Sequence, residues 1–212
     1  MSPVIYFIAI ITLILLTVGI IIAVIIAVIP SNNPPTNWPP IDFDEMQKRA
    51  AGQNGEHLAT AIIRSVLHEG DCLLTNVSIS YDGKPAELDN VIINPFGVFI
   101  IEVKNYKGRL YGNEDDYIWE KYKDDGYGNT FEKEVKNPIK QVKRQVYILA
   151  RTLSGFNVWV EGYAFLVQGN SPIQSHYILE NAEDIDRAIH SPGQNHLSLQ
   201  EVEQIRNTLM QR

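Results

Sequence analysis

Four charged side chains, Glu87, Asp89, Glu102 and Lys104, stand near the ends of an apolar stretch whose sequence is ELDNVIINPFGVFIIEVK. The stretch predicts two strands joined by a turn at residues 94–97. Because side chains alternate between the two faces of a strand, Glu102 and Lys104 are expected to point the same way. A hairpin built on that turn also brings Asp89 near Glu102. Two carboxylates and an amine would therefore converge at one end of an apolar sheet.

Two explanations fit this group of charges, and the residues alone leave both open. Ionised groups beside apolar strands are costly to desolvate unless they pair with one another or hold a metal. One explanation is a salt bridge at the rim of a sheet. The other is a site for Mg²⁺ or Mn²⁺, since carboxylate oxygens suit hard cations. Such a metal would activate water, and the Lys104 ammonium would hold that water or offset charge on a phosphate.

Four short motifs occur in order around these residues. They are Gly52-Gln53-Asn54-Gly55-Glu56, Glu87-Leu88-Asp89, the run from Gly97 to Tyr106, and Asn137-Pro138-Ile139-Lys140-Gln141. The order G-x-x-G-E, E-x-D, G-V-F-I-I-E-V-K-N-Y and N-P-x-x-Q resembles the nuclease-related domain (NERD) family of the PD-(D/E)xK nuclease superfamily. The resemblance covers residues 51–165.

The resemblance implies a fold and a set of roles. The expected fold class is α/β, with a restriction-endonuclease-like core in which a central mixed sheet is flanked by helices. The resemblance implies that Mg²⁺ or Mn²⁺ is held by Asp89, Glu102 and the backbone carbonyl of Val103, and that Lys104 acts on the attacking water or the phosphate. It also implies that Glu56 supports the metal or its water. Gln141 would orient the phosphate or a catalytic water.

Composition limits how such a protein could meet nucleic acid. The chain has 212 residues, one cysteine and a formal net charge of -7, so it is not a general DNA-coating protein. Any contact with nucleic acid, for which DNA is favoured over RNA, must use a local basic patch. The densest one lies on and just before a predicted helix from Pro138 to Ser154 with Gly155 as its C-cap. Its members are Lys136, Lys140, Lys143 and Arg144. A solvated helix surface would look similar.

The N-terminal segment differs from the rest of the chain. Residues 4–29 carry no charge and are long enough for a helix that spans a bilayer. Residues 1–29 are therefore predicted to form one transmembrane helix, residues 30–43 a proline-rich juxtamembrane linker, and residues 44–212 the nuclease-related domain. Basic residues follow the helix but do not precede it, which favours a single-pass membrane protein whose C-terminal domain is cytoplasmic.

The remaining elements are expected from local patterns. Helical periodicity runs from Asp44 to Val66, and a strand is expected from Cys72 to Ser80. The stretch after Lys104 predicts a glycine-marked strand and a loop-rich hairpin, whose aromatic side chains either stack on unpaired bases or fill the edge of a core. Further elements are a strand at residues 158–167, a helix at 179–189 and a last helix from the capping box at 198–201. The histidines His176, His190 and His196 lack metal-ligand spacing.

Three functions remain open from the sequence. The first is a membrane-anchored, metal-dependent nuclease that hydrolyses phosphodiester bonds in DNA or RNA. The second is a catalytically inactive module that binds nucleic acid or a protein at the membrane, which the acidic net charge favours. The third is a tethered structural domain with only salt bridges at the strand ends.

Overall fold

The computed structural model describes residues 55–191 and 196–211. The predicted transmembrane helix, the linker and the beginning of the first predicted helix lie outside these residues. Among the residues that the structure describes, no helix combines the length and the apolar character needed to cross a bilayer.

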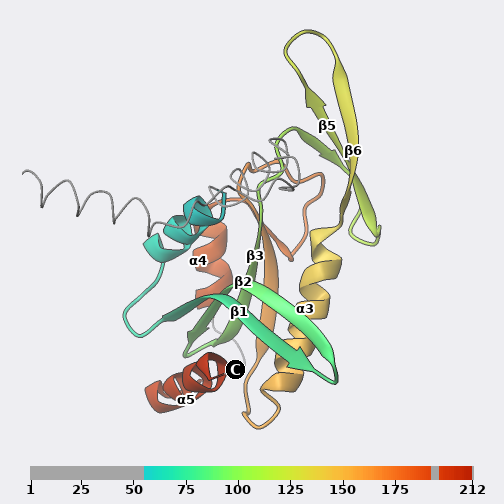
Figure 1. Ribbon diagram of the computed structural model, residues 1–212. Helices are drawn as coiled ribbons and strands as arrows, with labels where there is room; N and C mark the ends of the chain where they lie inside the picture. Colours follow the sequence, from blue (N-terminus) through green and yellow to red (C-terminus); the bar gives the residue numbers. More distant parts are fainter. Residues whose placement is uncertain (1–54, 192–195, 212) are drawn as a thin grey trace, which may run out of the picture. The chain divides into compact units, whose positions relative to one another are not determined.

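A five-stranded mixed sheet forms the centre of the described chain (Figure 1). Its strands lie in the order β1-β2-β3-β7-β8, with antiparallel pairing from β1 to β3 and parallel pairing from β3 to β8. The bounds are Cys72–Tyr81 for β1, Lys84–Asn94 for β2, Gly97–Lys104 for β3, Val160–Leu166 for β7 and Ile178–Leu179 for β8. The predicted α/β class with a central mixed sheet flanked by helices is confirmed.

The two hairpins of this sheet follow from their turn residues. Asp82 and Gly83 both have positive φ, 52° and 69°, which is the backbone that a two-residue turn between right-twisted strands requires. At the second turn the Asn94 side chain accepts a hydrogen bond from the Phe96 backbone N–H at 2.9 Å. This turn sets the β2–β3 register, in which Asn90 lies opposite Ile101. Asp89 and Glu102, the next residues outward, therefore lie at the open end of this ladder.

Helix α3 (Pro138–Thr152) supplies the connection that returns the chain to β7, parallel to β3. It begins at Asn137, whose side chain accepts from the Ile139 N–H, with Pro138 in the first turn. The predicted C-cap at Gly155 is wrong. The helix ends at Leu153, whose N–H bonds back to the Leu149 carbonyl and whose side chain is only 1% exposed. Burial of Leu153 on the sheet thus ends the helix before the glycine is reached.

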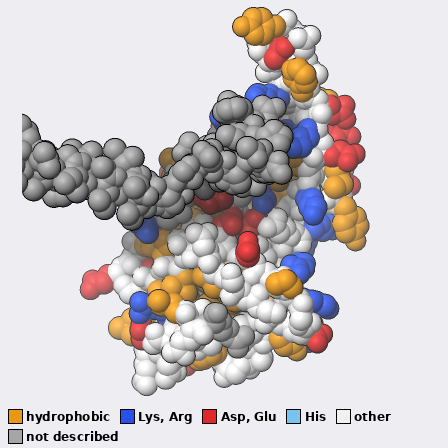
Figure 2. Space-filling model, in the orientation of Figure 1, with side chains coloured by type: hydrophobic (Ala, Val, Ile, Leu, Met, Phe, Trp, Pro, Cys, Tyr) orange, Lys and Arg blue, Asp and Glu red, His pale blue; other side chains and the backbone are white. Residues whose placement is uncertain are grey.

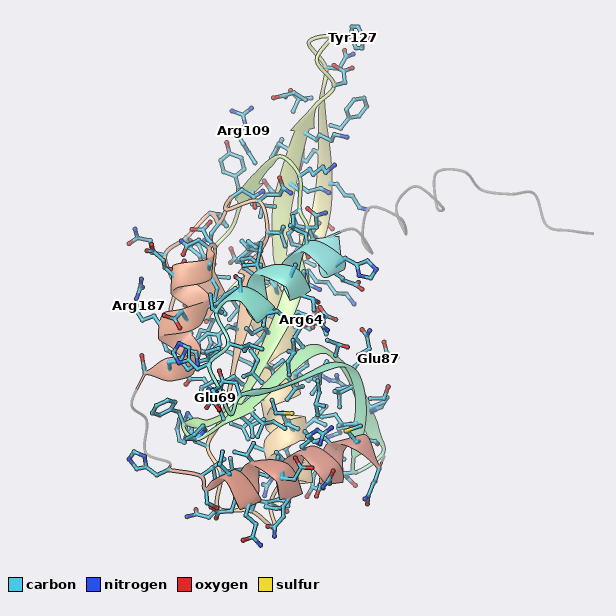
Figure 3. All side chains as sticks on the ribbon, turned by 90° about the vertical axis from the view of Figure 1, so that its left-hand side faces the viewer. Arg64, Glu69, Glu87, Arg109, Tyr127 and Arg187 are labelled. Atoms are coloured by element: carbon cyan, nitrogen blue, oxygen red, sulfur yellow. The ribbon has the colours of Figure 1, made fainter. Side chains whose placement is uncertain are left out.

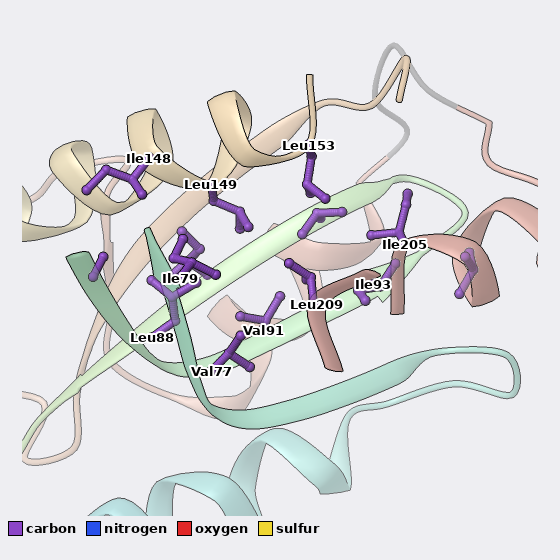
Figure 4. Packing of buried hydrophobic residues seen from close by; sticks show 14 of the residues in the cluster. Val77, Ile79, Leu88, Val91, Ile93, Ile148, Leu149, Leu153, Ile205 and Leu209 are labelled. Atoms are coloured by element: carbon purple, nitrogen blue, oxygen red, sulfur yellow. The ribbon is translucent and has the colours of Figure 1, made fainter. Parts of the chain in front are cut away.

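Helices cover both faces of the sheet. Figure 4 shows one face, where α3 and α5 (Leu199–Met210) pack on β1 to β3. The predicted capping box of α5 is present, with Ser198 and Glu201 bonded to each other's backbone N–H groups. On the other face the first described helix (residues 55–65) and α4 (Ala182–His190) enclose a second cluster of buried side chains. That cluster includes Ala59, Ile63, Ile92, Phe99, Ile101, Phe165, Ile185 and Ile189.

The helix predicted to start at Leu179 begins later. Ile178 and Leu179 form the edge strand β8 beside β7, and α4 starts only after Asn181, whose side chain caps it by accepting from the Asp184 N–H. Pairing with β7 therefore overrides the local helical pattern. At its other end α4 is tied to the loop after the first helix, because His190 contacts Asp71 at 2.9 Å.

His190 belongs to a cluster of side chains that could bind a metal ion, which the spacing of the histidines in the sequence did not predict. Its other ring nitrogen contacts Asp186 at 2.6 Å, and its ring stacks on the ring of His68 with centroids 3.7 Å apart. The ligand atoms of His68, Asp186 and His190 lie within 4.8 Å of one another. In the fold, this group joins the end of the first helix to the end of α4.

A second, three-stranded sheet is inserted between β3 and α3. It consists of β4 (Arg109–Tyr111), β5 (Ile118–Asp124) and β6 (Thr130–Lys136), all antiparallel. We call this sheet and the hairpin that joins β5 to β6 the arm. Figure 1 shows the arm extending beyond the end of the central sheet, and Figure 3 shows Tyr127 at its tip. The predicted loop-rich hairpin is thus largely regular strand, and Leu110 and Trp119 anchor it in a small core with Ile139 and Leu166.

Candidate functional site

The candidate site lies where β2 and β3 separate. Asp89 comes from β2, while Glu102 and Lys104 come from the last residues of β3. The Asp89 Oδ2 atom accepts a hydrogen bond from the Val103 backbone N–H at 2.7 Å. The three charged residues that the sequence predicted to converge are therefore brought together, and the side chain of Asp89 replaces a backbone partner at the end of the β2–β3 ladder.

Glu102 is the most buried charge of the site. Its residue is 3% exposed, and each of its carboxylate oxygens has a partner. Oε1 accepts from the Lys104 ammonium at 2.6 Å and from the Gln141 amide. Oε2 accepts from the Gln145 amide at 2.7 Å. A buried carboxylate is tolerated when such donors replace water, so this network explains how a charge can sit at the end of an apolar strand.

Gln145 is the functional residue that sequence reasoning missed. It is 2% exposed, and its amide also donates to the Glu87 backbone carbonyl at 2.9 Å. Its Oε1 atom is buried and has no hydrogen-bond partner among the described residues. A signal was available, because Gln145 follows Gln141 by four residues and such residues lie on one face of a helix. The motif N-P-x-x-Q thus extends by one helical turn into the same site.

The Asn-Pro part of that motif has a structural role. The Asn137 side chain is 1% exposed and donates to the backbone carbonyls of Asn113, Glu114 and Asp116, at 3.2, 3.0 and 2.8 Å. The same side chain caps α3 with its oxygen. Asn137 therefore fixes the start of the helix to the base of the arm. This sets the position of Gln141 one turn later.

The electrostatics of the site leave an excess of negative charge. Burial, and next the nearby charge of Glu102, raise the pKa of Asp89 from 3.8 to about 6. For Lys104, burial acts to lower the pKa, but the Glu102 carboxylate outweighs it, so the pKa is raised. Lys104 is therefore held as an ammonium and is not a proton acceptor near neutral pH. One ammonium does not balance the carboxylates around it.

Glu56 faces the same region from the first helix. It is exposed and, with Asp89, lines a cavity of about 320 Å³ between this helix and the middle of β1 and β2. Its charge contributes to the raised pKa of Asp89. The position beside it, Gly55, has no room for a side chain, because a Cβ there would lie 2.7 Å from the Asn105 side chain. The second glycine of the first motif thus lets the helix approach the chain just after Lys104.

The predicted basic patch is partly neutralised. Lys140 pairs with Asp115 at 3.4 Å and Lys143 with Glu114 at 3.1 Å, while Arg144 donates to the Pro85 backbone carbonyl at 2.9 Å. Lys136 lies at the end of β6 and is exposed. The four residues are thus near one another in the fold, but two of them face carboxylates from the base of the arm.

The donor set of the site fits a hard divalent cation. Two buried or half-buried carboxylates converge, and no described group donates a hydrogen bond to Asp89 Oδ1. The N–H and C=O of one strand residue point to the same side, so the Val103 carbonyl faces Asp89 as its N–H does. Excess negative charge and oxygen ligands are what Mg²⁺ or Mn²⁺ requires. Asp89, Glu102 and the Val103 carbonyl could therefore hold such an ion.

A larger cavity lies elsewhere. It measures about 380 Å³ and is lined by residues such as Phe96, Trp159, Glu161, His176 and Arg187. None of the predicted site residues contributes to it. Chemistry therefore points to the carboxylate site and not to this larger cavity.

Fold and site together define an α/β protein with a carboxylate–lysine site at the end of a buried hairpin. The profile of the nuclease-related domain matches residues 51–167, which is more than half of the chain and includes every predicted site residue. The chain belongs to the nuclease-related domain (NERD) family.

Other comparisons add a partial likeness. An uncharacterized protein of Bacillus anthracis is 32% identical over 69 residues, which is 32% of this chain and 32% of that protein. The chain thus spans about a third of the length of this curated relative. No solved structure matches.

Proposed function

We propose that this protein is a metal-dependent nuclease that hydrolyses phosphodiester bonds in nucleic acid. The observation that carries the proposal is the convergence of Asp89, Glu102 and Lys104, with more negative charge than the lysine offsets. Membership of a nuclease-related family supports the same class of reaction. We also propose that the mixed sheet with its two helical layers is a restriction-endonuclease-like core.

Each residue then has a role that its contacts support. Asp89, Glu102 and the Val103 carbonyl would hold Mg²⁺ or Mn²⁺. When bound, such an ion supplies charge neutralisation for the phosphate and lowers the pKa of a coordinated water. Lys104, held as an ammonium by Glu102, orients the attacking water or offsets the charge that develops on the phosphate oxygens.

Three further side chains support these groups. Gln141 and Gln145 hold the Glu102 carboxylate in one orientation by bonding to different oxygens of it. Gln141 is half-buried, and its amide is placed to orient a phosphate as well. Glu56 adds a third carboxylate from the open side of the cavity, where it would bind the metal's water.

The place of action in the cell is a separate part of the proposal. Residues 4–29 would anchor the protein as a single-pass membrane protein, and residues 30–43 would separate the anchor from a cytoplasmic domain. DNA, favoured over RNA, would be reached on that side of the membrane. Cysteine labelling of single-residue probes before and after the hydrophobic segment, in intact cells, tests this orientation.

Cleavage assays test the reaction. The full-length protein is incubated with plasmid, single-stranded DNA and RNA, with Mg²⁺ or Mn²⁺ and with EDTA. We expect metal-dependent cleavage that is lost in Asp89→Ala and Glu102→Ala and falls at least about 100-fold in Lys104→Ala. The matched control is Glu69→Ala, an exposed carboxylate away from the site (Figure 3). Full metal-dependent cleavage by Lys104→Ala would remove that residue from the mechanism.

One observation favours a second function, a catalytically inactive binding module. The Glu102 carboxylate already has three donors from Lys104, Gln141 and Gln145, so the site is stable as a purely protein network. This function predicts nucleic-acid or protein binding that persists in EDTA and in Asp89→Ala. Folded wild-type protein that binds but cleaves no substrate would select it.

A further inference from the structure

The arm has two faces of opposite charge. Paired residues of antiparallel strands share a face, and side chains alternate along each strand. The pairing Lys121↔Lys133 and Lys123↔Phe131 therefore places three lysines and a phenylalanine on one face. We call this the lysine face. The opposite face carries the carboxylates of Glu120, Asp124, Glu132 and Glu134 and only two cations, Lys136 and Arg109, of which Arg109 pairs with Asp124 at 3.7 Å.

The lysine face is the one turned toward the central sheet. Trp119 and Leu110 share it, and both are buried against Ile139 of α3 and Leu166 of β7. In Figure 2, blue side chains lie along the left-hand side of the arm and most red ones along its right-hand side. The positive and negative side chains are thus separated on the surface of the arm, as the register of its strands implies.

These lysines lack carboxylate partners among the residues that the structure describes. Lys121, Lys123 and Lys133 form no ion pair with another described side chain, whereas Lys140 and Lys143 of α3 do. Burial, and then the charges of Lys133 and Lys123, lower the pKa of Lys121. Like charges gathered without partners destabilise a surface. An anionic ligand would remove this cost.

Aromatic rings accompany the lysines and link them to the site. Phe131 is 60% exposed on the lysine face, and the Lys121 ammonium lies 5.9 Å from the centre of the Tyr106 ring. Tyr106 comes two residues after Lys104, and the charges of Lys104 and Glu102 act on its hydroxyl. A continuous track of cationic and aromatic side chains therefore leads from the arm to Lys104.

We propose that the lysine face binds the backbone of a single-stranded nucleic acid and leads it to the carboxylate site, with bases stacked on Phe131. Lysines two apart on a strand are about 7 Å apart, and cations alternating with exposed rings form the usual platform for single strands. The opposite face carries more carboxylates than cations and repels phosphate, so the lysine face is the side that binds. This inference rests on the proposed function, because it names the form of its substrate.

Binding measurements test the track without cleavage. The full-length protein is titrated in EDTA with a labelled 20-nucleotide oligothymidine at several salt concentrations. The triple variant Lys121→Ala/Lys123→Ala/Lys133→Ala is expected to bind about tenfold more weakly at low salt, with a salt slope shallower by about 2. Phe131→Ala should weaken binding and leave the slope unchanged. Circular dichroism confirms that the variants fold.

Two controls make the result specific. The charge-matched variant Lys84→Ala/Arg187→Ala/Arg206→Ala removes three positive charges elsewhere and should weaken binding much less. The second is Lys140→Ala/Lys143→Ala on α3. Equal loss in either control overturns the inference. The inference is also overturned if the wild type binds duplex DNA more tightly than the single strand and the arm variant loses the same factor of affinity for the duplex.

Hydrolysis of a small diester separates the two proposals. Bis(4-nitrophenyl) phosphate is too small to reach from the arm to Lys104, so the arm variant should hydrolyse it at the wild-type rate. If the arm variant binds the oligothymidine as tightly as the wild type does, and the diester is hydrolysed in a metal-dependent way, only the arm inference is overturned. If the arm variant binds the oligothymidine more weakly but the wild type hydrolyses no substrate, only the proposed reaction is overturned.

Discussion

The two sheets of this protein treat charge differently. In the five-stranded sheet β3 is buried from Gly97 to Val103, and its one buried charge, Glu102, has an individual donor for each oxygen. In the three-stranded sheet of the arm only Leu110 and Trp119 are buried, and the remaining charges are sorted by face. Burial forces specific pairing because desolvation is costly, while solvent tolerates unpaired charges and leaves them available to a ligand.

The largest difference between the sheets should appear in stability. Ile100 in β3 is fully buried between the hairpin partner and β7. Replacing it with Ala removes buried carbon atoms and leaves a cavity, so the free energy of unfolding should fall by about 3–4 kcal/mol. Urea denaturation followed by circular dichroism measures this. A loss below about 1 kcal/mol would show that the central sheet is not the stable part of the fold.

The next effect concerns the charge balance of the site. The pKa of Asp89 is raised from 3.8 to about 6, so the charged form disfavours the folded state without metal. The stability that a neutral Asp89 provides is present below about pH 4 and is lost as the pH rises through about 6. Asp89→Asn keeps an acceptor for the Val103 N–H and removes the charge. It should stabilise the metal-free protein by about 2 kcal/mol at pH 7.5.

Thermal unfolding in EDTA at pH 3.5 and at pH 7.5 measures the effect of Asp89→Asn. The gain should be absent at the lower pH, and added Mg²⁺ should stabilise the wild type more than the variant. The control is Asp115→Asn, whose side chain is 98% exposed. A variant that is less stable than the wild type at both pH values would contradict the excess negative charge.

A smaller loss is expected from Gln145→Ala. The change leaves the buried Glu102 Oε2 and the Glu87 carbonyl without their donor, at 2.7 and 2.9 Å in the structure. The free energy of unfolding should fall by about 1–2 kcal/mol. Nucleic-acid cleavage should fall about tenfold, mainly in kcat, because Gln145 positions Glu102 and does not bind substrate. Gln204→Ala on the exposed side of α5 is the control, and an equal response in both variants would remove this role.

The smallest effect belongs to the arm. Phe131 is 60% exposed, so Phe131→Ala should change the free energy of unfolding by less than about 0.5 kcal/mol. The same urea experiment as for Ile100→Ala measures it. A loss of 2 kcal/mol or more would mean that Phe131 packs in a core, and the contrast between the two sheets would fail at this residue.

Local patterns predicted much of this fold and part of the site. The hairpin that holds Asp89 and Glu102 follows from alternation and from the turn after Asn94, and the start of α3 follows from Asn137 and Pro138. The early C-cap at Leu153 was not predictable, because burial on the sheet decides it. The start of α4 was not predictable either, because Leu179 pairs with Phe165 of β7 and so belongs to a strand.

The sequence by itself determined which chemical groups meet at the hairpin, since Asp89, Glu102 and Lys104 lie within one locally folded stretch. Only the tertiary structure decided what surrounds them. Gln141 and Gln145 reach Glu102 from 39 and 43 residues away, and the three lysines of the lysine face lie together only because β5 and β6 pair in one register. Turn chemistry and side-chain alternation act over a few residues, whereas helix docking and strand register depend on the burial of whole elements.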